Sequence, residues 1–425
     1  MFKPVDVIEV RIWDTTVGAI AADPSLGAYV FEYDSGWRRR GIELAPLTMP
    51  TSEAIHVFPA LPEATYKRLP AMIADALPDD FGNALIDAWL AREGVAREAI
   101  SALDRLAYMG QRGMGALEFK PTHGPKKRKP SVLKVSDLVS ASRRALNERL
   151  DLEHAEAAIM QLIQVGTSAG GARAKAVVAW NPKTDEIRSG QLPAETGFEH
   201  WLLKIDGVGP DHELGEGGRY GRIEYAYHLM ARAAGIDMAD CRLFEENGRA
   251  HFMTRRFDRP GGEKLHVQSL CAMAHLDFRA RATHDYAQLF QCVEQLALPD
   301  EARAEVFRRM VFNVLAANCD DHSKNFAFLM DRRGQWSLAP AYDVTHAFNP
   351  KGEWTYQHLM SVNGRFTGID WNDFAQLGDR FLVPDYKGLY AKVKEAIASW
   401  PKYADKAGLP REHAQQIAGD FPPAG

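Results

Sequence analysis

The sequence predicts a bilobed α/β (α+β) fold, in which a small N-terminal α+β module precedes a strand-rich lobe and a mainly helical lobe. The chain has 425 residues, enough for roughly two or three domains. Alternating strand patterns are concentrated before residue 265, whereas helical patterns dominate after Ser269. Between the module and the first lobe lies a short stretch that contains prolines, a glycine and positive charge, which is typical of a linker. We therefore predict a module at 1–120, a linker at 121–135, and lobes at 136–265 and 266–425.

The N-terminal module is predicted from two strand patterns and a helical region. Residues 7–13 and 29–33 alternate between apolar and polar side chains, so both are expected to be half-buried antiparallel strands. Two or three amphipathic helices are expected across residues 65–106, including 83–92, where apolar residues recur at helical spacing. Residues 113–119 are predicted to close the module as a strand.

The linker contains the basic run Lys-Lys-Arg-Lys at residues 126–129. Four neighbouring positive charges bracketed by proline are most simply a solvated connector. Contact with a phosphate or a partner is the alternative interpretation.

The strand-rich lobe is predicted to begin with two helices over residues 136–163, the first capped by Ser136 or Asp137. A loop of small residues follows at 166–172. The remaining predicted elements are strands at 175–180, 200–205, 240–245 and 250–257, and a helix at 223–234 that Gly235 ends.

The helical lobe contains the most informative stretch, at residues 318–343. A long helix predicted over 301–317 ends where this stretch begins, so its polar residues are expected in a loop. A hairpin is predicted over 326–340, with its turn at 331–334 and Met330 paired with Gln335. That register brings Asp343 back opposite the loop that carries Asp320 and Asn325.

The spacing of these polar residues indicates phosphoryl transfer. In protein kinases a catalytic aspartate is followed, after four residues, by a metal-binding asparagine, and a second metal-binding aspartate lies beyond a hairpin. Asp320, Asn325 and Asp343 match that order. Because Mg²⁺ prefers hard oxygen ligands, Asn325 and Asp343 are predicted to hold it, and Asp320 is predicted to act as catalytic base.

Two other interpretations of this loop remain open. Its carboxylates can simply cap neighbouring backbone amides at a helix end. Alternatively, Asp320, Asp321, His322 and Asp343 can belong to a metal-dependent hydrolase, although the sequence contains no second cluster with metal-ligand spacing.

The strand-rich lobe contains candidate nucleotide-binding residues. The small-residue loop can let backbone N–H groups approach phosphates, or it can be a plain turn; its candidates are Ser168, Ala169, Gly170, Gly171 and Ala172. Lys204 lies at the end of an apolar strand, where a lysine either points outward or binds phosphate. Glu224, at the start of the next predicted helix, is the candidate partner of Lys204.

The composition of the chain indicates where in the cell the protein is expected and which partners it is expected to bind directly. The formal net charge is −5, which argues against electrostatic binding of nucleic acid by the chain as a whole. The four cysteines form no Cys-x-x-Cys pair, and neither a signal peptide nor a long apolar stretch is present. A cytoplasmic protein with no membrane association is therefore expected.

These motifs together resemble the HipA family of bacterial serine/threonine kinases, over nearly the whole chain. The resemblance rests on Met-Gly-Gln-Arg-Gly-Met-Gly-Ala at 109–116, Ser-Ala-Gly-Gly-Ala-Arg-Ala-Lys at 168–175, and Trp-Leu-Leu-Lys at 201–204. It also rests on Arg-Phe-Asp-Arg at 256–259, Asp-x-His-x-Lys-Asn-Phe at 320–326, and Leu-Ala-Pro-Ala-Tyr-Asp at 338–343.

The resemblance implies a protein-kinase-like fold that binds ATP and Mg²⁺ between its lobes. It places His322 and Lys324 with Asp320 and Lys204 in the catalytic site, and Phe257 near the adenine. It also implies autophosphorylation of Ser168, with Thr167 as a second acceptor, after which activity falls because a new dianion repels ATP. Asp321 departs from the family pattern, and an extra carboxylate there is expected to raise a pKa or alter metal binding.

The partners that the resemblance implies are a protein substrate, such as an aminoacyl-tRNA synthetase, and a HipB-like helix-turn-helix antitoxin. DNA would then be contacted only through the antitoxin. The predicted function is that of a HipA-type toxin kinase. A catalytically silent nucleotide-binding module that acts with such an antitoxin is the alternative.

Overall fold

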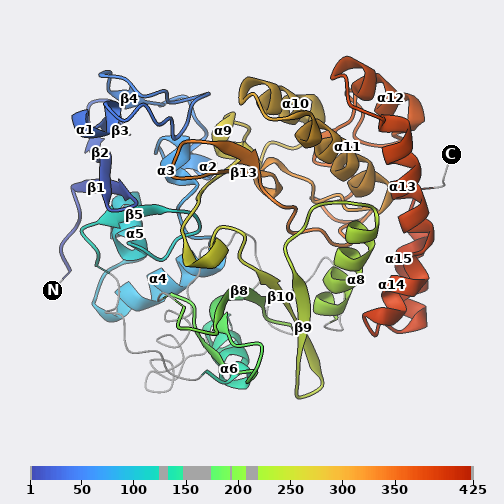
Figure 1. Cartoon of the computed structure of the whole chain (residues 1–425). Coiled ribbons are helices and arrows are strands. Elements are labelled where there is room, and N and C mark those ends of the chain that lie inside the picture. Colours follow the sequence, from blue (N-terminus) through green and yellow to red (C-terminus); the bar gives the residue numbers. More distant parts are fainter. Residues whose placement is uncertain (1, 124–132, 147–173, 192–193, 207–218, 423–425) are drawn as a thin grey trace.

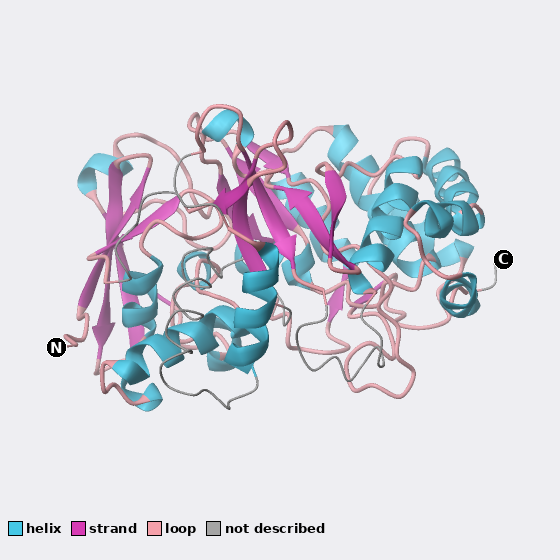
Figure 2. Cartoon of the chain, turned by 90° about the horizontal axis from the view of Figure 1, so that it is seen from below, coloured by secondary structure: helices cyan, strands magenta, loops and turns pink. Residues whose placement is uncertain are grey.

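The computed structural model describes residues 2–123, 133–146, 174–191, 194–206 and 219–422. The N-terminal module lies at one end of the molecule, and helices form the opposite, C-terminal end (Figures 1 and 2). The predicted bilobed α/β fold with an N-terminal module is confirmed. The basic run at 126–129, the loop at 166–172 and the second helix predicted within 136–163 lie outside the described residues.

The N-terminal module is built on a five-stranded antiparallel sheet in the order β4-β3-β2-β1-β5. Its strands are β1 Val7–Ile12, β2 Thr15–Asp23, β3 Ala28–Tyr33, β4 His56–Val57 and β5 Leu117–Lys120. The strands predicted at 7–13 and 29–33 are confirmed, but β2, which pairs with both, was not predicted. The strand predicted at 113–119 begins only at Leu117.

The N-terminal module also contains several helices and one 3₁₀ turn. They are α1 Ser35–Arg38, α2 Glu63–Tyr66, α3 Ala71–Ala74, α4 Asp80–Arg92, the 3₁₀ turn η1 Arg97–Ala99, and α5 Ala102–Met109. The Asp79 carboxylate caps α4, and Ser101 with Asp104 forms a capping box on α5. The helix predicted at 83–92 is confirmed as the greater part of α4.

A second antiparallel sheet, in the order β7-β6-β8-β10-β9, forms the strand-rich lobe. Its strands are β6 Lys175–Trp180, β7 Ile187–Ser189, β8 Glu199–Lys204, β9 Cys241–Glu246 and β10 Arg249–Arg255. Helices α4 and α5 of the module and α6 Val135–Leu146 share one apolar core with this sheet. The predicted cap of α6 is wrong, because the helix already begins at Val135 and contains Ser136 and Asp137.

Helix α8, Tyr220–Ala233, packs into the core of the helical lobe (Figure 1). It ends just before Gly235, whose φ of 86° suits a residue without a Cβ, as predicted. The helices of the lobe are α9 Leu270–Met273, α10 Tyr286–Gln295, α11 Asp300–Leu315, α12 Trp371–Arg380, α13 Tyr386–Ala398, α14 Trp400–Lys406 and α15 Arg411–Gly419. In the described part of the chain, none of the helices has the length and apolarity that a membrane span requires.

The predicted hairpin is present but is shifted by one residue. Strands β13 Ala327–Met330 and β14 Trp336–Leu338 pair Met330 with Trp336 instead of Gln335. The Asp331 side chain accepts hydrogen bonds from the backbone N–H groups of Arg333 and Gln335, which stabilises a longer connection. The other short elements are η2 Pro260–Gly262, β11 His266–Ser269, β12 His284–Asp285, η3 Ser323–Asn325 and β15 Met360–Ser361.

Close packing of α8 against β10 depends on Gly221. A Cβ built on Gly221 would lie 2.0 Å from the carbonyl oxygen of Ala250, so a side chain there must displace the helix. We expect Gly221→Ala to reduce the free energy of unfolding by about 1–3 kcal/mol. Urea unfolding measures this change. Gly419→Ala, where a Cβ meets nothing within 4 Å, is the matched control; equal losses in both variants would contradict the packing argument.

Candidate active site

A lysine from β8 lies between two carboxylates that come from distant parts of the chain. Lys204 Nζ lies 2.5 Å from Glu224 Oε1 on α8 and also donates a hydrogen bond to Asp343 Oδ1 beyond the hairpin. Its side chain is 13% exposed, so these ion pairs are shielded from water. The structure therefore brings together three of the residues that the sequence singled out.

The ionisation of this group follows from its geometry. Burial disfavours the charged form of Lys204, but Asp343 and Glu224 outweigh that effect and raise its pKa above the usual value. Burial likewise acts to raise the pKa of Asp343, yet Lys204 and Lys175 hold it well below its usual range. Lys204 is therefore positively charged and Asp343 negatively charged at neutral pH.

Lys175 is a candidate site residue that sequence reasoning did not assign. It is buried at the start of β6 and is paired directly with Lys204 across the two strands. Burial lowers the pKa of Lys175, whereas Asp343 and Asp79 act to raise it. The signal that could have found it is a lysine that opens an otherwise apolar strand, shortly after a glycine-rich stretch of the sequence.

The loop that follows α11 carries the predicted catalytic residues. Asp320 Oδ1 accepts a hydrogen bond from the indole Nε1 of Trp354 at 3.0 Å and lies 3.7 Å from His322 Nε2. Burial raises the pKa of Asp320, against the opposing effects of His322 and the indole. The Asp320 side chain is nevertheless 39% exposed, so a substrate can reach it.

His322 and Lys324 both pack on the ring of Phe278. The imidazole of His322 meets that ring edge-on at 5.3 Å, and Lys324 Nζ lies 4.7 Å from its centroid. The backbone carbonyl of Lys324 accepts a hydrogen bond from the Tyr342 hydroxyl at 2.6 Å. This contact connects the loop to the residue before Asp343.

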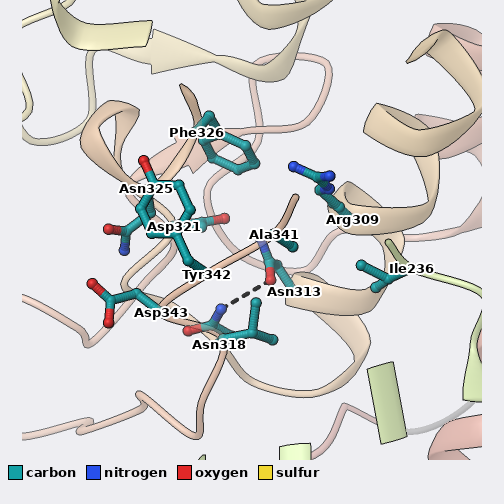
Figure 3. Close-up of a pocket in the computed structure, with 11 residues that line it drawn as sticks. Ile236, Arg309, Asn313, Asn318, Asp321, Asn325, Phe326, Ala341, Tyr342 and Asp343 are labelled. Atoms are coloured by element: carbon teal, nitrogen blue, oxygen red, sulfur yellow. Dashed lines mark hydrogen bonds between the residues drawn. The ribbon is translucent and has the colours of Figure 1, made fainter. Parts of the chain in front are cut away.

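Asn325 and Asp343, the predicted metal ligands, line one pocket. Figure 3 shows the Asn325 amide and the Asp343 carboxylate on the same side of it. Asn325 Nδ2 donates a hydrogen bond to the backbone oxygen of Asp320 at 2.7 Å, so the amide oxygen Oδ1 is the atom suited to a cation. Asp343 has a φ of 53°, an uncommon left-handed conformation that is often found at functional sites.

The residues present are chemically suited to Mg²⁺, although they make an incomplete shell. An ionised carboxylate and an amide oxygen are ligands that this ion accepts. Among the described residues no three His, Cys, Asp or Glu side chains form a metal-binding group. A Mg²⁺ site here therefore fits an ion that takes its remaining oxygens from phosphates and water, as is usual for this metal.

Asp321 has a different environment from its neighbour Asp320. It is 1% exposed and accepts hydrogen bonds from the Tyr286 hydroxyl at 2.8 Å and the Leu359 N–H at 2.8 Å. His358 Nδ1 lies 3.0 Å from its second oxygen. Asp321 thus joins the loop to α10 and to the segment around residue 358, which favours an anchoring role over the metal-binding role that the hydrolase interpretation gives it.

The ion pair between His358 and Asp321 predicts a pH-dependent contribution to stability. Burial acts to lower the pKa of His358, but Asp321 outweighs it and raises the pKa to about 10. An unfolded histidine has a pKa of about 6.5, so the contribution is complete below that pH and is lost as pH rises toward 10. Between pH 6.5 and 10, we expect the free energy of unfolding of the wild-type protein to fall by roughly 3–5 kcal/mol more than that of His358→Gln. Urea unfolding of both proteins at several pH values checks this. The same pH dependence of the free energy of unfolding in both would contradict it.

Phe257 lies beside the site, and its neighbours are fixed by a buried ion cluster. Its ring is 5.7 Å from that of Tyr342. Asp258 is fully buried and accepts hydrogen bonds from Arg256, from Arg259 and from the backbone N–H of Gly115 in the N-terminal module. Burial acts to raise the pKa of Asp258, but the two arginines lower it to about 2. The motifs at 109–116 and 256–259, which are far apart in the sequence, are therefore in contact here.

The predicted phosphate loop lies outside the described residues. It comprises Ser168, Ala169, Gly170, Gly171 and Ala172. Their assignment remains a prediction.

Both parts of the chain are similar to known proteins. Sequence profiles of the HipA N-terminal domain and the HipA-like C-terminal domain match residues 8–120 and 167–421. The serine/threonine-protein kinase toxin HipA of Shewanella oneidensis is 20% identical over 388 residues, which cover 84% of this chain and 79% of that protein. The Sinorhizobium fredii proteins Y4mE and Y4dM are 27% and 23% identical over 125 and 240 residues. These matches cover 27% and 52% of this chain, but only 30% and 55% of those relatives' own length.

The fold comparison covers almost the whole chain. The solved structure of Shewanella oneidensis HipA in complex with HipB and operator DNA superposes with a TM-score of 0.68. The alignment covers 97% of this chain and 94% of that one, at 17% identity. At this identity the likeness concerns the fold.

Proposed function

The chain belongs to the HipA family, and on that premise we propose that it is an ATP- and Mg²⁺-dependent serine/threonine protein kinase. The single observation that carries the proposal is Lys204 held between Glu224 and Asp343. Protein kinases use such a lysine–glutamate pair beside a metal-binding aspartate to position the phosphates of ATP. The presence of Asp320 and Asn325 on the adjoining loop supports the same assignment.

Each residue has a role that its surroundings suit. Lys204 would bind the phosphates, with Lys175 as a second cation nearby, and Phe257 would contact the adenine. Asn325 and Asp343 would hold Mg²⁺, which when bound neutralises phosphate charge. Asp320 would orient the acceptor hydroxyl and take its proton, with His322 and Lys324 beside it.

The proposed acceptors and partners follow the family. Autophosphorylation is assigned to Ser168, and the external substrate to a cellular protein such as an aminoacyl-tRNA synthetase. A small HipB-like helix-turn-helix antitoxin is the proposed partner, with DNA contacted through it; the likeness to HipA in its complex with HipB and operator DNA supports this. Co-purification of such a protein when the two are expressed together tests the partner.

Intact mass after incubation with Mg-ATP tests the kinase assignment. The expected result is a gain of one phosphoryl group that peptide mapping places on Ser168 and that Ser168→Ala removes. Tight binding of ATP without any transfer would instead support the catalytically silent module. A gain equal to a nucleoside monophosphate would indicate adenylyl transfer.

A further inference from the structure

The segment that follows Asp343 returns to the catalytic loop and is fixed there at both ends. On one side, the Cys319 N–H donates to the Ala347 carbonyl at 3.0 Å. On the other side, the Asp321 carboxylate accepts hydrogen bonds from His358 and from the Leu359 N–H. The intervening residues 348–357 therefore form a loop clamped against the residues that flank Asp320.

The interior of this loop is also ordered by specific contacts. The Asn349 N–H donates to the Thr355 carbonyl at 3.1 Å, and Asn349 accepts a hydrogen bond from the Lys351 N–H on its side chain. Arg281, from a neighbouring loop, donates to the backbone carbonyl of Glu353. These contacts restrict the position of Trp354, the next residue.

Trp354 places its indole N–H on one oxygen of the proposed catalytic base. The indole Nε1 donates to Asp320 Oδ1 at 3.0 Å, and His322 Nε2 approaches the same oxygen from 3.7 Å. A hydrogen bond to Oδ1 fixes the rotation of the carboxylate and leaves Oδ2 to meet an acceptor hydroxyl. Since a misplaced reacting group can lose on the order of 10²-fold in rate, this orientation matters for transfer.

We propose that Trp354 is a positioning residue for phosphoryl transfer, holding Asp320 so that its second oxygen faces the acceptor hydroxyl. The inference rests on the proposed function of the site and adds to it a group outside the catalytic loop. The 348–357 loop has a role as well, because the hydrogen bonds at its two ends place the Trp354 indole next to Asp320.

The test compares two substitutions that remove the same kind of hydrogen bond. Trp354→Phe keeps an aromatic ring but removes the N–H. Trp180→Phe is the matched control, because the Trp180 indole also donates to a carboxylate, that of Asp185 at 2.8 Å, on the strand-rich lobe. Replacement of Trp354 alone by benzothienylalanine, whose ring has sulfur in place of the N–H, preserves the shape if Phe packs poorly.

The readout is autophosphorylation at varied concentrations of Mg-ATP, with ATP affinity measured separately by calorimetry. We expect both changes at Trp354 to lower the maximal rate about tenfold or more, without changing the ATP concentration at half-maximal rate or the affinity. Trp180→Phe should stay within about twofold of the wild-type rate.

Four outcomes would overturn the inference. An unchanged maximal rate would show that the hydrogen bond does not position Asp320. A higher rate would show that the indole blocks the acceptor site, and a loss of ATP affinity in parallel with rate would indicate a merely structural role. A wild-type protein that binds ATP but transfers nothing would overturn the proposed function itself, and the inference with it.

Discussion

Asp320→Asn is expected to reduce phosphoryl transfer by at least about a hundredfold while the protein stays folded and binds ATP. A general base contributes about 10²–10⁴ to rate, and asparagine cannot accept the proton. The fold should tolerate the change, because the amide oxygen can still accept the Trp354 hydrogen bond and a partly buried charge is removed. Transfer of labelled phosphate, with calorimetric ATP binding, measures both effects.

The neighbouring residue supplies a matched control for this prediction. Asp321→Asn is the same substitution one position along, but it leaves the His358 imidazolium buried without its carboxylate. We expect it to lower the free energy of unfolding by about 3–5 kcal/mol. If Asp320→Asn retained wild-type transfer, or if Asp321→Asn impaired transfer selectively without loss of stability, the roles assigned to the two residues would be wrong.

Lys204→Met is expected to abolish phosphoryl transfer and to destabilise the protein by about 3–5 kcal/mol. The substitution removes the cation that Glu224 and Asp343 share, and it leaves both carboxylates in a shielded site. Urea unfolding and the phosphate-transfer assay measure the two effects. Lys264→Met is the control, since it breaks the Lys264–Glu118 ion pair at a distance of 2.7 Å outside the proposed site.

A second substitution separates the two effects of Lys204→Met. Adding Glu224→Gln removes one of the two carboxylate charges that have lost Lys204, so part of the lost stability should return. Transfer should not return, because no cation then faces the phosphates from β8. Recovery of activity together with stability would mean that Lys204 serves the fold alone.

Much of the fold could be predicted because its signals are local. Strands β1, β3, β6 and β8 show apolar or alternating patterns that burial requires, and α11 is a long helix whose second half is mainly apolar. Strand β2 was missed because it is rich in small residues, including Gly18. A Cβ on Gly18 would lie 2.1 Å from the carbonyl oxygen of Glu32, so glycine there reflects close strand pairing that the sequence does not display.

The candidate site was predictable only in part, for a related reason. The spacing of Asp320, Asn325 and Asp343 is a short-range pattern, so it could be read directly. The contacts of Trp354 with Asp320 and of His358 with Asp321 span 34 and 37 residues. No periodicity of the sequence predicts such long-range contacts. The buried anchoring role of Asp321, which depends on its contact with His358, was therefore not predictable. The predicted hairpin register was wrong because the Asp331 carboxylate accepts hydrogen bonds from the backbone N–H groups of Arg333 and Gln335, which lengthens the connection by one residue.

In the proposed active site, Asn325 and Asp343 hold a divalent ion beneath the phosphates of ATP. A crystal structure with Mn²⁺ and a non-hydrolysable ATP analogue tests it most directly, because anomalous scattering locates the metal without reference to the protein. We expect a manganese peak bonded to Asn325 Oδ1 and to an Asp343 carboxylate oxygen, with phosphate oxygens completing the shell. Bound nucleotide whose metal contacts neither side chain would contradict it.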